Sequence, residues 1–502
     1  MAKSGEIHVH LPDGLRRDTV VLGNKGQSMA SDVTKHVEHE KVVGRKDIIL
    51  FCISAILLLD TVAAGAAIGA SSIFWWVFLG LVFFIPFSLI SAELGCAYPD
   101  QGGIYAWVRR AYGSRWASRI TWSYWVNVAV WCPAIYILFA GIFKQLFWPE
   151  MSLLGQIMIG IGLTWLTVLV NVITLDIGKW VPNVGAVVKL IVFAAVIVGA
   201  ALYYAENGAV NEISLATLKP NLGDGLQYLP VIIYGMLGFE LICAGSDEIK
   251  NPEKAVPKGI LISGVIIIAL YILATVAVLT AIPVADINLV EGLVDTLMLF
   301  FGGSELGRLF VIVLAIGTLY TFFSNGVTWA LGSNRAAAEA AIDGELPAFF
   351  AVESEKHGTP VGAAVALGVA STVILVLYGL LAGSNEELFW SLFAFSGVIF
   401  LIPYVAMMFA YVKLRRDEPY SDQPGRDRPF EIGGPTWLPT TLACVCAFVL
   451  CVTIILFIYT PGSGVQWPVL GGSIILLTIG EIIVHINSKA PQDGDDSSQA
   501  SG

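Results

Sequence analysis

The sequence predicts an all-α membrane protein with twelve transmembrane helices. Hydrophobic residues make up 56% of its 502 residues and charged residues only 13%, whereas soluble domains carry about 25% charged residues. Apolar stretches of about 20 residues recur along the chain, each long enough to cross a hydrocarbon core of about 30 Å. These stretches are continuous rather than alternating, which indicates helices and not the strands of a barrel.

The expected spans are separated mostly by short connections. A polar segment at 1–46 precedes them, a polar loop is expected at 205–224, and two longer loops are expected at 332–359 and 415–436. The composition of the tail at 488–502 predicts disorder. The spans cover residues 47–70, 73–98, 120–145, 153–175, 183–204, 225–246, 257–283, 307–331, 360–383, 388–414, 438–460 and 466–487.

The basic residues predict the orientation of these spans. With a cytoplasmic amino terminus, 24 of the 28 Lys and Arg residues lie on one face of the membrane. The opposite face holds only Lys144, Lys219 and Arg308, while Lys189 lies within a span. Because basic residues favour the cytoplasmic side, we expect a multi-pass protein of the cell (plasma or inner) membrane with both termini inside. The polar first segment is not a cleavable signal peptide, so the first apolar helix would direct insertion.

Several classes of function are disfavoured. The net charge of −11 gives no support for nucleic-acid binding. No nucleophile triad, phosphate-binding glycine loop or cluster of metal ligands appears, so we expect neither an enzyme nor a metal or other cofactor. The seven cysteines lie within or beside apolar runs, where Cys packs as a small hydrophobe rather than in a disulfide framework.

Ionisable residues inside spans are costly and point to function by default. Asp60, Lys189 and Glu240 lie deep within their spans, whereas Glu93 and Glu481 lie near span ends, where a solvated or capping role is expected. No histidine falls in the middle of a span. Any coupling to protons would therefore use carboxylates or Lys189.

Asp60 and Glu240 occur in similar contexts, five spans apart. Span 1 reads LDTVAAGAAIG at 59–69 and span 6 reads YGMLGFE at 234–240. Small residues and an acid interrupt both spans, a pattern that is typical of the substrate site of a carrier. A broken helix exposes backbone N–H groups that can bind a carboxylate and C=O groups that can bind an ammonium. Close helix packing through glycine fits the pattern equally well. The candidate binding residues are Asp60, Thr61, Ala64, Gly65, Tyr234, Gly238 and Glu240.

Longer motifs resemble those of a known family. The sequence GFE at 238–240 is followed by DEIKNPEKAVP at 247–257, and SAEL at 91–94 leads to PDQGGIYAW at 99–107. Further motifs are Asn334-Arg335, DGELP at 343–347, GTP at 358–360 and RPF at 428–430. Over residues 45–487 the chain resembles the amino acid–polyamine–organocation (APC) family, and it looks closest to the antiporters that exchange glutamate for GABA or arginine for agmatine.

The resemblance implies a LeuT-like fold. Two inverted five-helix repeats would cover 47–204 and 225–414, and two extra helices 438–487, all within a transporter domain at 47–487. Substrate would bind between the broken spans 1 and 6, with spans 3, 8 and 10 closing over it.

The resemblance also implies roles for individual residues. Tyr124 matches the gating tyrosine of span 3, Trp329 the tryptophan of span 8 that packs on substrate, Tyr404 the tyrosine of span 10, and Glu240 the gating acid. Aromatic side chains in such positions can cover an aliphatic or cationic substrate.

The chain departs from this pattern at two points. The family's glycine-rich break in span 1 is Thr61-Val62-Ala63-Ala64-Gly65 here. Lys189 resembles the span-5 lysine of proton-coupled or sodium-independent permeases, whose amine can stand where other members hold sodium. Exchange and proton symport therefore both stay open, with Lys189 and Glu240 as the candidate proton-coupling groups.

We expect a sodium-independent secondary transporter of amino acids or related amines. Its partners would be a small-molecule substrate, the lipid bilayer and protons, with a homodimer left open. An alternative cargo is a polyamine, because Asp60 and Glu240 would supply two acids for two ammonium groups. A transporter-like nutrient sensor is the rival of a different class.

Overall fold

The computed structural model describes residues 44–59, 61–98, 103–173, 177–220, 224–240, 249, 251–354, 356–417, 430–462 and 464–487. All of them belong to one unit, Lys41–Gly502. The predictions made for Asp60, for the polar segment before residue 44 and for the tail at 488–502 lie outside the described residues.

The described chain is helical apart from one short hairpin. In this hairpin Tyr459 pairs with Val465 and Thr460 with Gly464. The elements are α1 (Arg45–Ile56), α2 (Val62–Ala66), α3 (Ser71–Leu79), the π-helix η1 (Gly80–Phe84), α4 (Ile85–Ala97), α5 (Ile104–Tyr112), α6 (Ser114–Phe147), α7 (Leu153–Ile173), α8 (Ile177–Asn207), η2 (Asp224–Tyr228), α9 (Leu229–Tyr234), α10 (Pro252–Ala281), η4 (Val284–Asp286), α11 (Gly292–Phe301), α12 (Glu305–Ile342), η5 (Ala348–Ala351), α13 (Val361–Gly379), α14 (Asn385–Asp417), α15 (Trp437–Ile458), β1 (Tyr459–Thr460), β2 (Gly464–Val465) and α16 (Trp467–Asn487).

Ten helices of the described chain are long and apolar enough to cross a membrane. They coincide with ten of the twelve expected spans; the continuous run through α3, η1 and α4, for example, covers Ser71–Ala97. The two expected spans without such a helix are 47–70 and 225–246. In these two segments the described helix is interrupted after Ile56 and again after Tyr234.

Two of the boundaries that differ from the expected ones have a clear local cause. Helix α12 continues past residue 331 to Ile342, into the region expected to be a loop. Its last turns contain a run of alanines, the strongest helix former, and this local preference extends the helix. Helix α6 begins at Ser114, directly after Gly113, whose φ of +83° separates it from the short helix α5.

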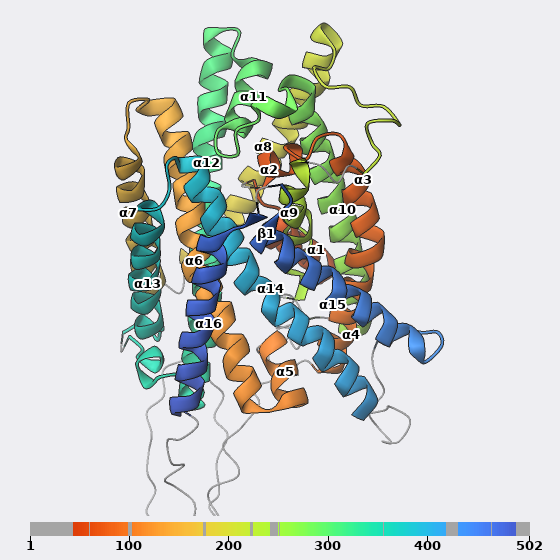
Figure 1. The fold of residues 1–502 in the computed structure, drawn as a ribbon, viewed down its shortest axis with the longest axis vertical. Coiled ribbons are helices and arrows are strands. Elements are labelled where there is room, and N and C mark those ends of the chain that lie inside the picture. Colours follow the sequence, from red (N-terminus) through yellow and green to blue (C-terminus); the bar gives the residue numbers. More distant parts are fainter. Residues whose placement is uncertain are drawn as a thin grey trace, which may run out of the picture. The chain divides into compact units, whose positions relative to one another are not determined.

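Helix α6 lies at the centre of the helix packing. It packs against α14, α12, α7, α13 and α5, and most of its side chains between Ala117 and Ile142 are buried. Helices α7 and α13 lie side by side, and α10 packs against both α1 and α8 (Figure 1). The two interrupted segments therefore lie next to long, continuous helices that can hold side chains in place around them.

Candidate substrate site

The break in span 6 begins where α9 ends at Tyr234. Gly238 has a φ of +105°, a conformation that residues with a Cβ rarely adopt, so glycine is required at this turn. Its backbone N–H, which has left the helical ladder, donates a hydrogen bond of 3.1 Å to Glu240 Oε2. The break thus turns a backbone donor toward the one acidic side chain of this segment.

Glu240 is held by a second donor from a distant part of the chain. The Tyr404 hydroxyl, on α14, donates a hydrogen bond of 2.7 Å to Glu240 Oε1. Glu240 is only 3% exposed and Tyr404 is fully buried. The backbone N–H of Glu240 itself is a further donor, and a carboxylate with about four acceptor sites can still accept from one more partner.

A continuous series of aromatic rings extends from Tyr404, the hydrogen-bond partner of this carboxylate, and we call it the aromatic cluster. Phe400 is its centre, with ring centroids 4.9 Å from Tyr404, 5.0 Å from Tyr234 and 5.9 Å from Trp329. Trp329 in turn lies 6.1 Å from Trp131 and 6.3 Å from Tyr124 on α6. The cluster consists of Tyr124, Trp131, Tyr234, Trp329, Phe400 and Tyr404.

The exposure of the cluster is uneven. Tyr234 and Tyr404 are buried, whereas Tyr124 and Trp329 keep part of their surface accessible. The indole Nε1 of Trp131 is buried and has no hydrogen-bond partner among the described residues. Four candidate residues from three helices and the broken segment thus belong to one series of ring contacts that reaches Glu240 through Tyr404: they are Tyr124, Tyr234, Trp329 and Tyr404.

The break in span 1 is stabilised by Tyr271 of α10. Its hydroxyl donates 3.0 Å to the carbonyl of Ile56, the last residue of α1, and accepts a 2.8 Å hydrogen bond from the N–H of Leu58. The Tyr271 ring stacks on Trp76 at 4.7 Å, and both rings lie against Gly235 in the break of span 6. One tyrosine therefore satisfies the opened backbone of span 1 and connects it to span 6.

The remaining candidates of span 1 lie on or beside α2. Thr61, Ala64 and Gly65 are buried, and Thr61 Oγ1 donates 3.4 Å to the carbonyl of Leu58. Helix α2 packs against α9 and α10. The two interrupted segments are thus neighbours in space, as a shared site requires.

Lys189 is fully enclosed within the helix packing. It is 1% exposed, and its Nζ donates a 2.7 Å hydrogen bond to Asn325 Oδ1 on α12. Asn325 precedes Trp329 by one helical turn, so the two residues share one face of α12. The lysine therefore contacts the helix that contributes Trp329 to the aromatic cluster, through Asn325, a residue that the sequence did not single out.

A family model described as amino acid permease matches residues 44–480, nearly the whole described chain. The chain belongs to the amino acid permease family. This confirms the resemblance to the APC family and makes the protein a multi-pass membrane transporter of amino acids or amines rather than an enzyme.

Relatives of the permease include antiporters. A Lactococcus lactis protein named "Probable agmatine/putrescine antiporter" is 33% identical over 447 residues, which are 87% of this chain and 93% of the relative. An uncharacterized transporter of Legionella pneumophila is 28% identical over 84% of this chain and 90% of its own length. The glutamate/gamma-aminobutyrate antiporter of Lactococcus lactis is 24% identical over 68% of this chain and 70% of its own.

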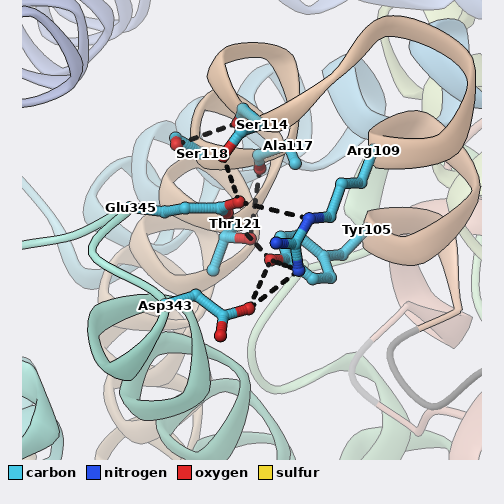
Figure 2. Close-up of polar contacts among 8 residues, drawn as sticks. All are labelled: Tyr105, Arg109, Ser114, Ala117, Ser118, Thr121, Asp343 and Glu345. Atoms are coloured by element: carbon cyan, nitrogen blue, oxygen red, sulfur yellow. Dashed lines mark hydrogen bonds and ion pairs between the residues drawn. The ribbon is translucent and has the colours of Figure 1, made fainter. Parts of the chain in front are cut away.

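Two sequence motifs of the permease meet in a polar network at one end of the helices (Figure 2). Tyr105, in the motif before α6, donates 2.8 Å to Glu345 Oε2, and Arg109 pairs with Asp343 at 2.8 Å. Ser114 also donates to Glu345. Burial, and then the neighbouring Glu345 carboxylate, raise the pKa of Tyr105, so its hydroxyl remains a donor at any working pH. The network therefore joins the connection between spans 2 and 3, which holds Tyr105 and Arg109, to the connection between spans 8 and 9, which holds Asp343 and Glu345.

Glu93 occupies a second network, which corrects the expected solvated or capping role. Its carboxylate is 1% exposed and lies 2.6 Å from the Arg415 guanidinium on α14. Tyr411 and the backbone N–H of Ile432 also donate to it, each at 2.9 Å. Glu481 differs: its side chain is 56% exposed and pairs with Arg119.

Proposed function

We propose that the permease is a secondary carrier that exchanges amino acids or related amines, with cationic amines as the preferred class. The observation that supports this most is the Glu240 carboxylate, buried at the break of span 6 beside the aromatic cluster. An ammonium group would neutralise the carboxylate, and the ring faces would attract the same cation. The name of the agmatine/putrescine relative supports the same class.

An amino acid is the second candidate substrate. The Trp131 Nε1–H is a hydrogen-bond donor that an ammonium cannot use and a carboxylate can. The description of the family model and the name of the glutamate/gamma-aminobutyrate relative support this reading.

We further propose that transport is independent of sodium and that its coupling involves protons. The Lys189 amine would supply the positive charge for which a sodium-dependent carrier needs an ion, and its contact with Asn325 links that charge to α12. Glu240 would act as the gating acid.

The proposed fold is LeuT-like, with twelve spans and both termini on the cytoplasmic side of the cell membrane. Ten continuous helices and two neighbouring interrupted segments support it. The roles proposed for Thr61, Ala64, Gly65, Tyr124, Tyr234, Gly238, Trp329 and Tyr404 are those of the substrate site.

Counterflow in liposomes tests this function. Vesicles containing the full chain are loaded with agmatine, putrescine, arginine, glutamate or GABA and then given a trace of the labelled compound outside. We expect uptake with loaded amine and none into empty vesicles, and the same uptake after choline replaces sodium. If no compound of the panel shows counterflow, the proposal of a carrier for these amines and amino acids is wrong. The transporter-like nutrient sensor then becomes the better hypothesis. Uptake that requires sodium contradicts the role proposed for Lys189.

A further inference from the structure

Cationic and aromatic side chains meet in one series on the surface at one end of three helices. The Lys413 Nζ lies 5.0 Å from the centre of the Tyr112 ring, and Tyr112 lies 6.3 Å from Trp116. The Arg119 guanidinium lies 4.9 Å from the Trp116 ring and pairs with Glu481. We call the series Lys413, Tyr112, Trp116 and Arg119, contributed by α14, α5 and α6, the cation–aromatic ladder.

The ladder carries excess positive charge. Arg115 is exposed beside Trp116, and no carboxylate of the described chain lies within ion-pair distance of it. Arg416, with 75% of its side chain exposed, extends the series beyond Lys413. Among the described residues, two carboxylates, Asp417 and Glu481, pair with ladder residues or with Arg416. Within the described part of this surface, the four basic groups Arg115, Arg119, Lys413 and Arg416 therefore outnumber the two acidic groups.

Exposed apolar residues border the ladder. Phe409 is 54% exposed and precedes Lys413 by one turn on α14, and its carbonyl accepts a hydrogen bond from the Tyr112 hydroxyl. On α16 the exposed Ile482 follows Glu481 directly. Trp116 and Tyr112 are themselves exposed, the two residue types that concentrate where hydrocarbon meets headgroups. The ladder therefore stands at the boundary between lipid-facing surface and water.

We propose that the cation–aromatic ladder binds the phosphate-bearing headgroup of an anionic lipid in the leaflet predicted to be cytoplasmic. The guanidinium and ammonium groups would contact the phosphate, and the acyl chains would lie along Phe409 and Ile482. A membrane lipid fits better than free phosphate, because the apolar border continues the charged surface into the hydrocarbon. Each basic residue near an anionic membrane surface strengthens binding about fivefold.

Native mass spectrometry of the purified full chain tests the proposal without reference to transport. The protein in detergent is titrated with phosphatidylglycerol or with phosphatidylcholine. We expect preferential retention of phosphatidylglycerol, and binding about 25-fold weaker for the double variant Arg115→Gln/Arg416→Gln. The matched control is Lys258→Gln/Arg335→Gln, which removes two exposed charges on α10 and α12, on the same predicted side. The control should bind as the unmodified protein does.

Four outcomes overturn the proposal. They are equal retention of both lipids, an equal loss in both double variants, displacement of the lipid by inorganic phosphate at comparable concentration, and a second copy of the chain on this surface in place of lipid. If the double variant is not monodisperse, the single variant Arg416→Gln decides, with an expected loss of about fivefold.

Discussion

Tyr404 and Glu240 form a buried hydrogen bond of 2.7 Å that connects α14 to the break in span 6. Backbone N–H groups of Gly238 and of Glu240 itself also donate to this carboxylate, and the Tyr404 hydroxyl is the donor that comes from a distant helix. The orientation of the acid in the candidate site therefore depends both on its own segment and on a hydroxyl from a helix more than 160 residues further along the chain.

Removing the Tyr404 hydroxyl while keeping its ring should weaken transport. Tyr404→Phe takes away one hydrogen bond to a charged group, worth about 1.5–3 kcal/mol, so we expect amine uptake to fall roughly 10- to 100-fold. Because both residues act through one contact, adding Glu240→Gln to Tyr404→Phe should cost less than the two single losses combined. Full additivity, measured by counterflow in all three variants, would mean that the pair does not act as a unit.

Trp329→Ala should weaken binding or transport strongly while leaving expression and folding intact. A desolvated cation over an indole ring gains about 2 kcal/mol, which corresponds to a roughly 30-fold loss of affinity when the ring is removed. Trp437→Ala is the matched control, since this tryptophan is 61% exposed on α15. Unchanged transport by Trp329→Ala would assign the ring a structural role and weaken the likeness to the antiporters.

Proton coupling should separate Lys189 from Glu240. If the lysine couples transport to protons, Lys189→Ala abolishes pH-dependent accumulation but leaves substrate binding. Asn325→Leu then disturbs the same pH dependence, because it removes the 2.7 Å hydrogen bond to Lys189. If the acid gates, Glu240→Gln flattens the pH dependence of exchange. We favour the lysine for coupling and the acid for gating. Uptake measured against pH decides, and identical profiles in all variants would make the carrier a pH-insensitive exchanger.

The topology can be tested by cysteine labelling. Because of the distribution of basic residues, cysteines placed in 205–224 or 286–305 should label from outside, and those in 415–436 only from inside. Leu215→Cys and Gly433→Cys are suitable, since Leu215 is 86% exposed and a side chain at Gly433 meets open space. Outside labelling of Gly433→Cys refutes the twelve-span arrangement.

The Glu93–Arg415 pair should be needed for stability. Arg415→Met leaves the buried Glu93 carboxylate without its guanidinium, a change that costs about 3–5 kcal/mol for a buried pair and less here, because Arg415 is 20% exposed. Glu93→Gln added to Arg415→Met should restore part of the loss. Thermal unfolding in detergent measures both, and a double variant less stable than Arg415→Met would contradict this account.

The sequence was informative where local patterns decide the structure. Apolar runs predicted ten helices closely. Gly238 indicated the break of span 6, because residues with a Cβ rarely adopt the backbone conformation found there. Long-range contacts carry no local signal. Tyr271 lies 215 residues from Ile56 and Asn325 lies 136 residues from Lys189, so neither partner could be found from spacing. Glu93 looked solvated because its position near a span end does not reveal Arg415.

The double hydrogen bond of the Tyr271 hydroxyl bears on how this part of the molecule could be re-engineered. The opened backbone of span 1 is satisfied by an atom that belongs to α10. In a chimera that exchanges span 1 alone, the foreign span 1 would meet a Tyr271 that did not evolve with it. The hydrogen bonds between the Tyr271 hydroxyl and the opened backbone could then be lost. Spans 1 and 7 therefore constitute one exchangeable module, and successful recombination between homologous carriers should inherit both from the same parent.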